Sequence, residues 1–374
     1  MHLRALRNGA IAAVITAIVG FAVNALFATA GTDDSAASPP TTTGSPTPTC
    51  APTAEALERS ALGGMTGRFE DVWRDRTNDA WAVGAAGTSD TESTPVLAHW
   101  DGTSWTPADV TTVGTTEGLE AIDGARPTDA WAVGWSSDGL GKDTVALHYD
   151  GTAWTAADTP TNATLFDVRA LGPNDVWAVG SEGDPDFVDE TAIALHWDGS
   201  AWTPATLDVR GGRSGLSAIA GDDGDLWAVG YHHAGPLVLH YDGTSWTSVD
   251  VTVRGPLQAV AVDDGTVWLG GTSILRGDGT TFDPIGKTRT GATFSDIVPD
   301  TDAHALAVGS LAGVDTTRAV AVEIDGDRTR PVHLKAPGDD ALEAVAAGRK
   351  DVLAVGWHAS ARGDVPLVAT VLPC

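Results

Sequence analysis

Residues 119–134 read LEAIDGARPTDAWAVG, and residues 144–155 read TVALHYDGTAWT. In both segments large apolar residues alternate with small or polar ones, which is typical of β-strands rather than of helices. Between the two strands that the second segment contains, Asp150–Gly151 supplies the left-handed backbone of a tight hairpin. Trp154 then begins a new strand. Together the two segments predict one unit of four short antiparallel strands.

The unit occurs in seven copies along the chain. Residues 165–180 (LFDVRALGPNDVWAVG) and 193–203 (IALHWDGSAWT) form another clear copy. Leu353, the last equivalent of the repeated Trp, follows Trp81 by 272 residues, or about 45 residues per step over six steps. This period is typical of propellers, and the period-two alternation excludes helical solenoids. The sequence predicts an all-β, seven-bladed β-propeller of four-stranded antiparallel blades. We expect the blades to begin near Phe69, Leu119, Leu165, Leu216, Leu257, Phe294 and Leu342.

The seventh copy ends without the segment that supplies a fourth strand. Residues 367–374 read LVATVLPC, with no Asp-Gly turn and no following Trp. The other cysteine, Cys50, lies at the opposite end of the propeller region, and a ring brings its ends together. We therefore expect a disulfide between Cys50 and Cys374. Residues 53–62 either complete blade seven as a strand or form a more helical clasp over the gap, and the clasp fits their composition better.

The N-terminus carries an export signal. Arg4 and Arg7 precede an apolar run over residues 10–27, and Ala28-Thr29-Ala30 resembles a cleavage site. We expect one hydrophobic helix within residues 1–30, either a cleaved signal peptide or a signal anchor whose residues 10–27 cross the membrane. Residues 31–49 are rich in Pro, Thr and Ser and predict a flexible linker. The propeller domain is expected over residues 50–374, outside the cytoplasm, at the cell surface or secreted.

Composition narrows the classes of partner. The chain has 22 Lys and Arg against 50 Asp and Glu, a net charge of −28, which excludes nucleic acid as a partner. Two cysteines and no histidine at ligand spacing predict no metal site and no cofactor. Four histidines recur at one repeat position, which favours a structural role near the Asp-Gly hairpin over catalysis. These are His99, His148, His196 and His240. The repeated Trp105, Trp154, Trp202 and Trp246 are expected to pack between blades.

The DVWAVG and HWDGxxW segments resemble the repeats of secreted bacterial β-propellers, in the broad Asp-box and photosystem-assembly-type propeller group. The resemblance covers residues 69–373 and implies a fold rather than a function. At the Asp-box position the match is partial, because Asp101 and Gly102 are adjacent and His99 stands before them. The arginine cluster with which sialidases bind a carboxylate has no counterpart. The resemblance therefore implies no glycosidase activity and no catalytic residue.

One repeat position varies in a way that suggests a binding site. It follows the WAVG motif, at a strand end that opens into a loop of variable length. The residues there are Ala85, Trp135, Ser181, Tyr231, Gly271, Ser310 and Trp357. The three aromatic residues, with His232, His233 and His358 beside two of them, are candidate ligand-binding residues, because variable loops on a rigid scaffold often carry binding. Covering the blade ends is the alternative role for these side chains.

Three alternative functions are compatible with these features of the sequence. The first is an exported binding module, tethered to the cell surface, that recognises a glycan or an extracellular protein as a monomer. The second is a secreted polysaccharide hydrolase or lyase on a propeller scaffold, and the third is a structural envelope protein. An enzyme requires a constellation of carboxylates, Tyr or His that does not follow the repeat. No such constellation stands out in the sequence, which favours the binding module.

Overall fold

The structure, a computed structural model, describes residues 66–371 with short gaps. The gaps are residues 76–77, 88–92, 111–113, 115, 139–141, 184–189, 234, 287–290, 315, 335–337, 349–350 and 361–362. The expected helix at residues 10–27, the linker and both cysteines of the expected disulfide lie outside the described residues. Within the described part, no helix is long and apolar enough to cross a membrane.

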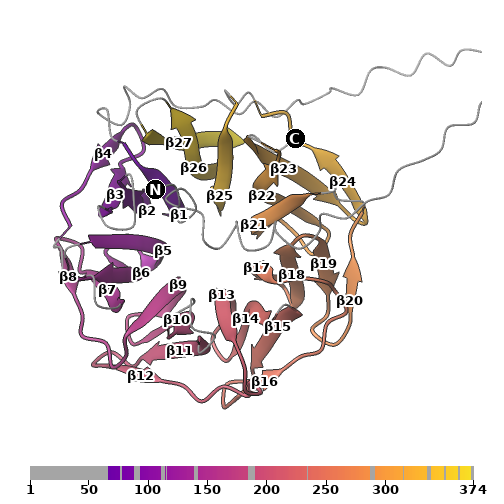
Figure 1. Cartoon of the computed structure of the whole chain (residues 1–374), viewed down its shortest axis with the longest axis horizontal. Helices are drawn as coiled ribbons and strands as arrows, with labels where there is room; N and C mark the ends of the chain where they lie inside the picture. Colours follow the sequence, from indigo (N-terminus) through magenta and orange to yellow (C-terminus); the bar gives the residue numbers. More distant parts are fainter. Residues whose placement is uncertain are drawn as a thin grey trace, which may run out of the picture. The chain divides into compact units, whose positions relative to one another are not determined.

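Seven antiparallel sheets stand around a common axis (Figure 1). The strands of each sheet run in sequence order from the axis outward, so each sheet is one blade and is built from one repeat. Six blades have four strands, and the described part of blade 7 has three. The predicted seven-bladed propeller of antiparallel blades is thereby confirmed. Closure into a ring removes most of the exposed strand edges.

The strand bounds follow the repeats. Blade 1 contains β1 (Arg68–Arg74), β2 (Ala80–Ala86), β3 (Thr94–Trp100) and β4 (Trp105–Pro107). Blade 2 contains β5 (Thr116–Arg126), β6 (Asp129–Ser137), β7 (Asp143–Tyr149) and β8 (Trp154–Ala156). Blade 3 contains β9 (Ala163–Gly172), β10 (Asp175–Glu182), β11 (Thr191–Trp197) and β12 (Trp202–Pro204). Blade 4 contains β13 (Ser214–Asp222), β14 (Asp225–His232), β15 (Gly235–Tyr241) and β16 (Trp246–Ser248).

The remaining blades are less regular. Blade 5 contains β17 (Leu257–Asp263), β18 (Thr266–Gly271), β19 (Ile274–Gly277) and β20 (Phe282–Pro284). Blade 6 contains β21 (Ala292–Pro299), β22 (His304–Ala312), β23 (Thr317–Asp325) and β24 (Arg328–Pro331). Blade 7 contains β25 (Asp340–Ala347), β26 (Val352–Ser360) and β27 (Gly363–Val371). Each expected blade start lies in the innermost strand and is at most 1 % exposed: Phe69, Leu119, Leu165, Leu216, Leu257, Phe294 and Leu342.

The two faces of the ring differ. The loops between second and third strands, and the links between blades, lie at one end of the strands. We call this end the variable-loop face. The opposite DG-turn face carries the Asp-Gly turns, in which the Gly backbone is left-handed, as at Gly151 (φ 90°). Asp150 there accepts a bond from the Thr152 hydroxyl at 2.6 Å and bonds from the backbone N–H groups of Ala153 and Thr152 at 3.0 and 2.8 Å. These three bonds lower its pKa to about 2.

The seams between blades are aromatic, as predicted. Trp131 of blade 2 contacts Trp202 of blade 3 edge to face at 5.1 Å, and His148 stacks on the same indole at 4.6 Å. Nε2 of His148 lies 2.9 Å from Oδ1 of Asp129. The pattern recurs in three more blades, which confirms the structural role of the histidines. Their partner is the Asp that opens the second strand rather than a group in the Asp-Gly hairpin. The other pairs are His99–Asp79, His196–Asp175 and His240–Asp225.

Aspartates on the innermost strands connect neighbouring blades. Asp71 sits at a β-bulge, where Oδ1 accepts from the N–H of Val72 and Oδ2 from the N–H of Ile122 in the next blade, each at 2.7 Å. Asp167 and Asp296 make the same two bonds from blade 3 to blade 4 and from blade 6 to blade 7. Burial dominates their electrostatics and raises the pKa of Asp71 to about 8 and that of Asp296 to about 7.

Candidate functional site

The three aromatic residues proposed for binding end the second strands of their blades on the variable-loop face. Trp135 pairs across the sheet with Gly118, Tyr231 with Gly215 and Trp357 with Ala341. A Cβ on Gly118 would lie 2.9 Å from Nε1 of Trp135, and one on Gly215 would lie 2.8 Å from the Tyr231 hydroxyl. The rings of Trp135 and Tyr231 therefore lie against the innermost strand, and the glycine opposite each ring leaves room for it.

A cation covers each of these rings. Nζ of Lys142 lies 4.9 Å from the Trp135 ring, and the Arg213 guanidinium lies 5.4 Å from Tyr231. The Arg68 guanidinium lies 5.3 Å from the ring of Trp357. Such contacts contribute about 0.5–1 kcal/mol at exposed sites and more when desolvated. The rings thus have packing partners, and they also show a surface that accepts positively charged groups.

Tyr231 belongs to a polar network between blades 3 and 4. Oε1 of the buried Glu190 accepts from the Ser181 hydroxyl at 2.7 Å, and its Oε2 accepts from Nε of Arg213 at 3.0 Å. Burial and a hydrogen bond to Glu190 raise the pKa of Tyr231. The network connects the loop after β10 to the start of β13. It accounts for the position of Tyr231 without a ligand.

The three histidines occupy different surroundings. His232 donates from Nε2 to the carbonyl of Arg210 at 3.0 Å, and its ring lies 4.3 Å from that of the exposed His233. His358 donates from Nδ1 to the carbonyl of Asp339 at 3.1 Å. These residues share the variable-loop face with the aromatic rings but belong to blades 4 and 7. The structure therefore separates the Tyr231 group on blade 4 from Trp135 and Trp357 on blades 2 and 7.

Trp135 and Trp357 flank a set of charged residues on the innermost strands of blades 7, 1 and 2. Nε1 of Trp135 donates to Oε1 of Glu120 at 2.8 Å, and Nε1 of Trp357 donates to Oε1 of Glu343 at 3.0 Å. Glu70 occupies the same repeat position on β1, in blade 1, which lies between blades 7 and 2. We call Arg68, Glu70, Glu120, Trp135, Glu343 and Trp357 the axial cluster. The innermost strands β25, β1 and β5 lie next to one another on one side of the ring axis in Figure 1.

The axial cluster concentrates negative charge. Arg68 lies 3.8 Å from Glu70 and 2.5 Å from Asp364 of β27, so one guanidinium serves several carboxylates. Burial raises the pKa of Glu70 well above its ordinary value, and repulsion from Glu343 and Glu120 raises it further. Burial also raises the pKa of Glu120 and of Glu343, partly offset by their bonds from the tryptophans. Crowded, half-buried like charges destabilise a fold, and such arrangements are frequent at functional sites.

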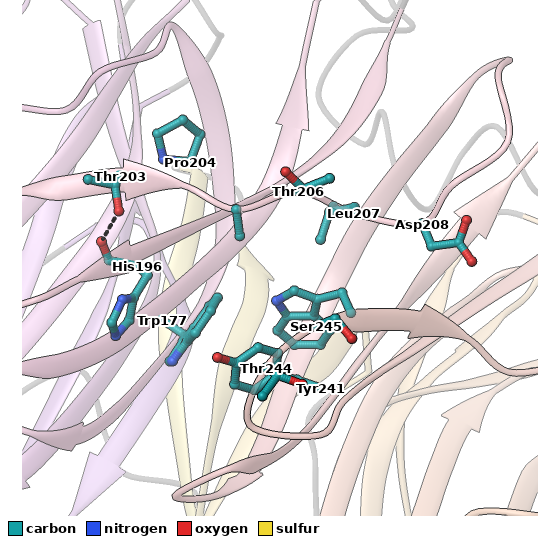
Figure 2. A pocket seen from close by; sticks show the side chains of 12 residues that line it. Trp177, His196, Thr203, Pro204, Thr206, Leu207, Asp208, Tyr241, Thr244 and Ser245 are labelled. Atoms are coloured by element: carbon teal, nitrogen blue, oxygen red, sulfur yellow. Dashed lines mark hydrogen bonds between the residues drawn. The ribbon is translucent and has the colours of Figure 1, made fainter.

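The outer wall of the ring has a groove between blades 3 and 4, with a volume of about 530 Å³ (Figure 2). The Tyr241 ring lies 4.9 Å from Trp177, beside Trp246 at 5.3 Å. Blades 1 and 2 repeat this arrangement with Trp81 and Tyr149 at 5.1 Å. Because the aromatic residues follow the repeat and pack on one another, the groove belongs to the seam rather than to a singular site.

Within the described residues, no group of three or more His, Cys, Asp or Glu side chains is arranged to hold a metal ion. The sequence did not predict a site at the three glutamates of the axial cluster. They belong to three different repeats and become neighbours only when the ring closes. Two features of the sequence could have indicated this site. Glu70, Glu120 and Glu343 share one repeat position, and a glycine or alanine stands opposite each of the three aromatic residues.

Comparison with known proteins supports the fold and does not assign the chain to a protein family. No protein-family model matches the chain, and no curated protein matches it. Among solved structures it is similar to YCF48 bound to D1 peptide, with a TM-score of 0.57 and 15 % identity, covering 88 % of this chain and 99 % of that one. It is also similar to the β-propeller domain of Cps50 (Swd1) from Myceliophteria thermophila, at a TM-score of 0.59 and 8 % identity, covering 86 % and 100 %.

A third similar structure is the extracellular domain of the putative one-component system BT4673 from B. thetaiotaomicron. The TM-score is 0.56 at 11 % identity, and the match covers 85 % of this chain and 40 % of that one. At these identities the likeness shows the fold alone. It supports the broad propeller group that the repeats suggested. The similar structures do not show whether other propellers share the WAVG and HWDGxxW motifs.

Proposed function

We propose that the protein is an exported, surface-tethered binding module that recognises another protein through the axial cluster on its variable-loop face. The observation that carries the proposal is the crowding of Glu70, Glu120 and Glu343 between two half-buried indoles. A lysine or arginine of a partner would relieve the repulsion among the glutamates. It could also stack on Trp135 or Trp357, whose faces already accept cations from their own chain.

A protein fits this surface better than a neutral glycan. Lysine and arginine side chains supply charge opposite to that of the cluster, whereas neutral sugars offer only hydroxyl groups and ring faces. The peptide in the similar YCF48 structure gives a precedent for a propeller that holds a peptide. Tyr231, His232, His233 and His358 lie on the same face and would contact only a larger partner.

A peptide array and a glycan array tested against the full chain distinguish these ligands. We expect selective binding of peptides with Lys or Arg over twins in which Gln replaces these residues. Replacement of Trp135 and Trp357 by Ala should weaken binding at least about tenfold, or about 1.4 kcal/mol. Ser310→Ala, at the same repeat position in blade 6, is the matched control and should bind normally. Binding of glycans alone, or loss of binding on Tyr231→Ala only, would refute the proposal.

A polysaccharide hydrolase or lyase is the second candidate, because a carboxyl with a raised pKa suits a general acid. Glu70 is the residue with the largest such effect in the cluster. Release of reducing or unsaturated sugar ends from a polysaccharide panel, abolished by Glu70→Gln, would establish this activity. If the wild-type chain cleaves no polysaccharide of the panel, the enzyme hypothesis fails and the binding function is retained.

A further inference from the structure

Every innermost strand carries a β-bulge at the same repeat position. In blade 1 the register shifts between Phe69 and Asp71, which leaves Glu70 without a pairing residue on β2, and the other six blades shift at the equivalent place. Bulges re-aim a side chain and are frequent next to active sites. We call the seven bulged residues the bulge ring. In blade order they are Glu70, Glu120, Phe166, Ser217, Gln258, Ser295 and Glu343.

The bulge ring faces the axis of the propeller. Its members are all partly exposed, although the core residue directly before each of them is at most 1 % exposed. Both Glu120 and Glu343 repel Glu70, and the Ser295 hydroxyl donates a hydrogen bond to Glu343 of the next blade. Bulged side chains of blades 6, 7, 1 and 2 thus meet in one common space. The equivalent residues of blades 3 to 5 face the same space, because they share the bulge.

The bulge ring has two unlike halves. Blades 7, 1 and 2 contribute the three glutamates of the axial cluster, whereas blades 3 to 6 contribute no charge. The uncharged members are Phe166, Ser217, Gln258 and Ser295. Phe166 is the one apolar residue of the ring, and it comes next after Glu120, because β9 packs beside β5 around the axis (Figure 1). An apolar side chain therefore adjoins the acidic half.

Phe166 takes no part in the seams between the described blades. The other phenylalanines that the structure describes, Phe69, Phe282 and Phe294, each pack in an apolar cluster between two blades. Phe166 belongs to none of the seven clusters. Its neighbour Leu165 is buried in the seam with blade 2, so the phenyl ring points out of that seam. The ring stays partly in water, where an apolar contact would be favourable.

We propose that Phe166 binds an apolar side chain of the partner, beside the lysine or arginine that the axial cluster binds. The ligand is then a protein segment in which a basic residue has an apolar neighbour. Charge complementarity with the glutamates selects the basic residue, and burial of the phenyl ring selects the residue next to it. This specificity rests on the proposed function for the basic residue. Phe166 supplies the choice of the second side chain.

Phe166→Ser is the variant that tests this subsite, because the repeat itself has serine at the same bulge in blades 4 and 6. The fold should therefore tolerate the change. Ser217→Ala, at the equivalent position of the next blade, is the matched control. Neither substitution alters the axial cluster, so both variants should keep the preference for a basic residue.

Synthetic octapeptides that each carry one Arg, with Leu or Ser beside it, serve as probes. Twins with Gln in place of Arg report the charge preference. Fluorescence anisotropy with the full chain measures the dissociation constants. The wild-type chain and Ser217→Ala should bind the Arg-Leu peptides about tenfold more tightly than the Arg-Ser peptides. Phe166→Ser should bind both kinds alike and still prefer Arg over Gln.

The Phe166 subsite and the proposed function fail in different ways. If the wild-type chain does not distinguish Leu from Ser, or if Phe166→Ser keeps that distinction, the subsite is wrong and the preference for Arg over Gln stands. Equal losses in Phe166→Ser and Ser217→Ala, or an unfolded Phe166→Ser, would make the phenyl ring a structural residue and would also overturn the subsite. Equal affinity of the wild-type chain for Arg and Gln peptides, or no binding of any peptide, would refute the proposed function and the subsite with it.

Discussion

Trp131 and Trp135 are four residues apart on β6 and belong to regions built on different principles. Trp131 is 1 % exposed in the seam, and its indole N–H has no hydrogen-bond partner among the described residues, so it acts through apolar contact. Trp135 is half-buried and donates to a carboxylate that two other carboxylates repel. Seam residues recur from blade to blade, whereas the axial cluster occurs once. Repetition therefore marks residues that hold the ring, and departure from it marks the candidate site.

The largest expected difference between the two regions is in stability. Trp131→Ala removes a fully buried indole that contacts Trp202 and His148, and should lower the free energy of unfolding by about 3–5 kcal/mol. Trp135→Ala removes a half-buried ring and one contact with Lys142, and should lower it by about 1–2 kcal/mol. Urea unfolding of both variants measures the values. Equal losses would mean that Trp135 is a packing residue like Trp131.

The sequence predicted the seam far better than the axial cluster. Seven repeats share the same strand alternation, and most of them also carry the Asp-Gly turn and the indole, so the repeats alone predicted the fold. The histidine partner was harder to assign, because Asp129 is adjacent to His148 only across the sheet. The axial cluster depends on repulsion between Glu70 and Glu343, which are far apart in the sequence. Their shared repeat position was visible in the sequence, but their proximity follows only from closure of the ring.

Stability should fall as the pH rises, because the carboxyls of the innermost strands have folded pKa values above their unfolded ones. Asp71, with a pKa of about 8 in the folded chain, favours folding fully below about pH 4, and this contribution is lost as the pH rises toward 8. Each such carboxyl lowers the free energy of unfolding by up to about 1.4 kcal/mol per pH unit in that window. Urea unfolding between pH 4.5 and 8.5 measures the slope, which Asp71→Asn should reduce.

The seam variant Asp129→Asn provides the contrast, since it removes the partner of His148 and leaves the slope due to Asp71 in place. A wild-type stability that rises steadily from pH 4.5 to 8.5 would show that the innermost carboxyls are ionised without cost. The like-charge explanation of the axial cluster would then fail as well.

Neutralising one carboxylate in each region should change the free energy of unfolding in opposite directions, and by less than the tryptophan substitutions do. Asp129→Asn weakens the contact with His148 at 2.9 Å and should lower the free energy of unfolding by about 1 kcal/mol at pH 7. Glu70→Gln removes a repelled, desolvated charge and should leave stability unchanged or raise it by up to about 1 kcal/mol. Thermal unfolding of the two variants at pH 7 decides the sign. A clear loss in Glu70→Gln would make its pair with Arg68 a structural contact.

The most direct test of the account is the affinity of the full chain for one peptide pair, measured by calorimetry at pH 7. The pair is the strongest basic peptide from the array and its twin with Gln in place of Lys and Arg. We predict that the wild-type chain prefers the basic peptide by about tenfold or more, and that Glu70→Gln narrows this preference severalfold while the variant stays folded. Equal affinity for both peptides, or an undiminished preference in Glu70→Gln, would contradict recognition by the axial cluster.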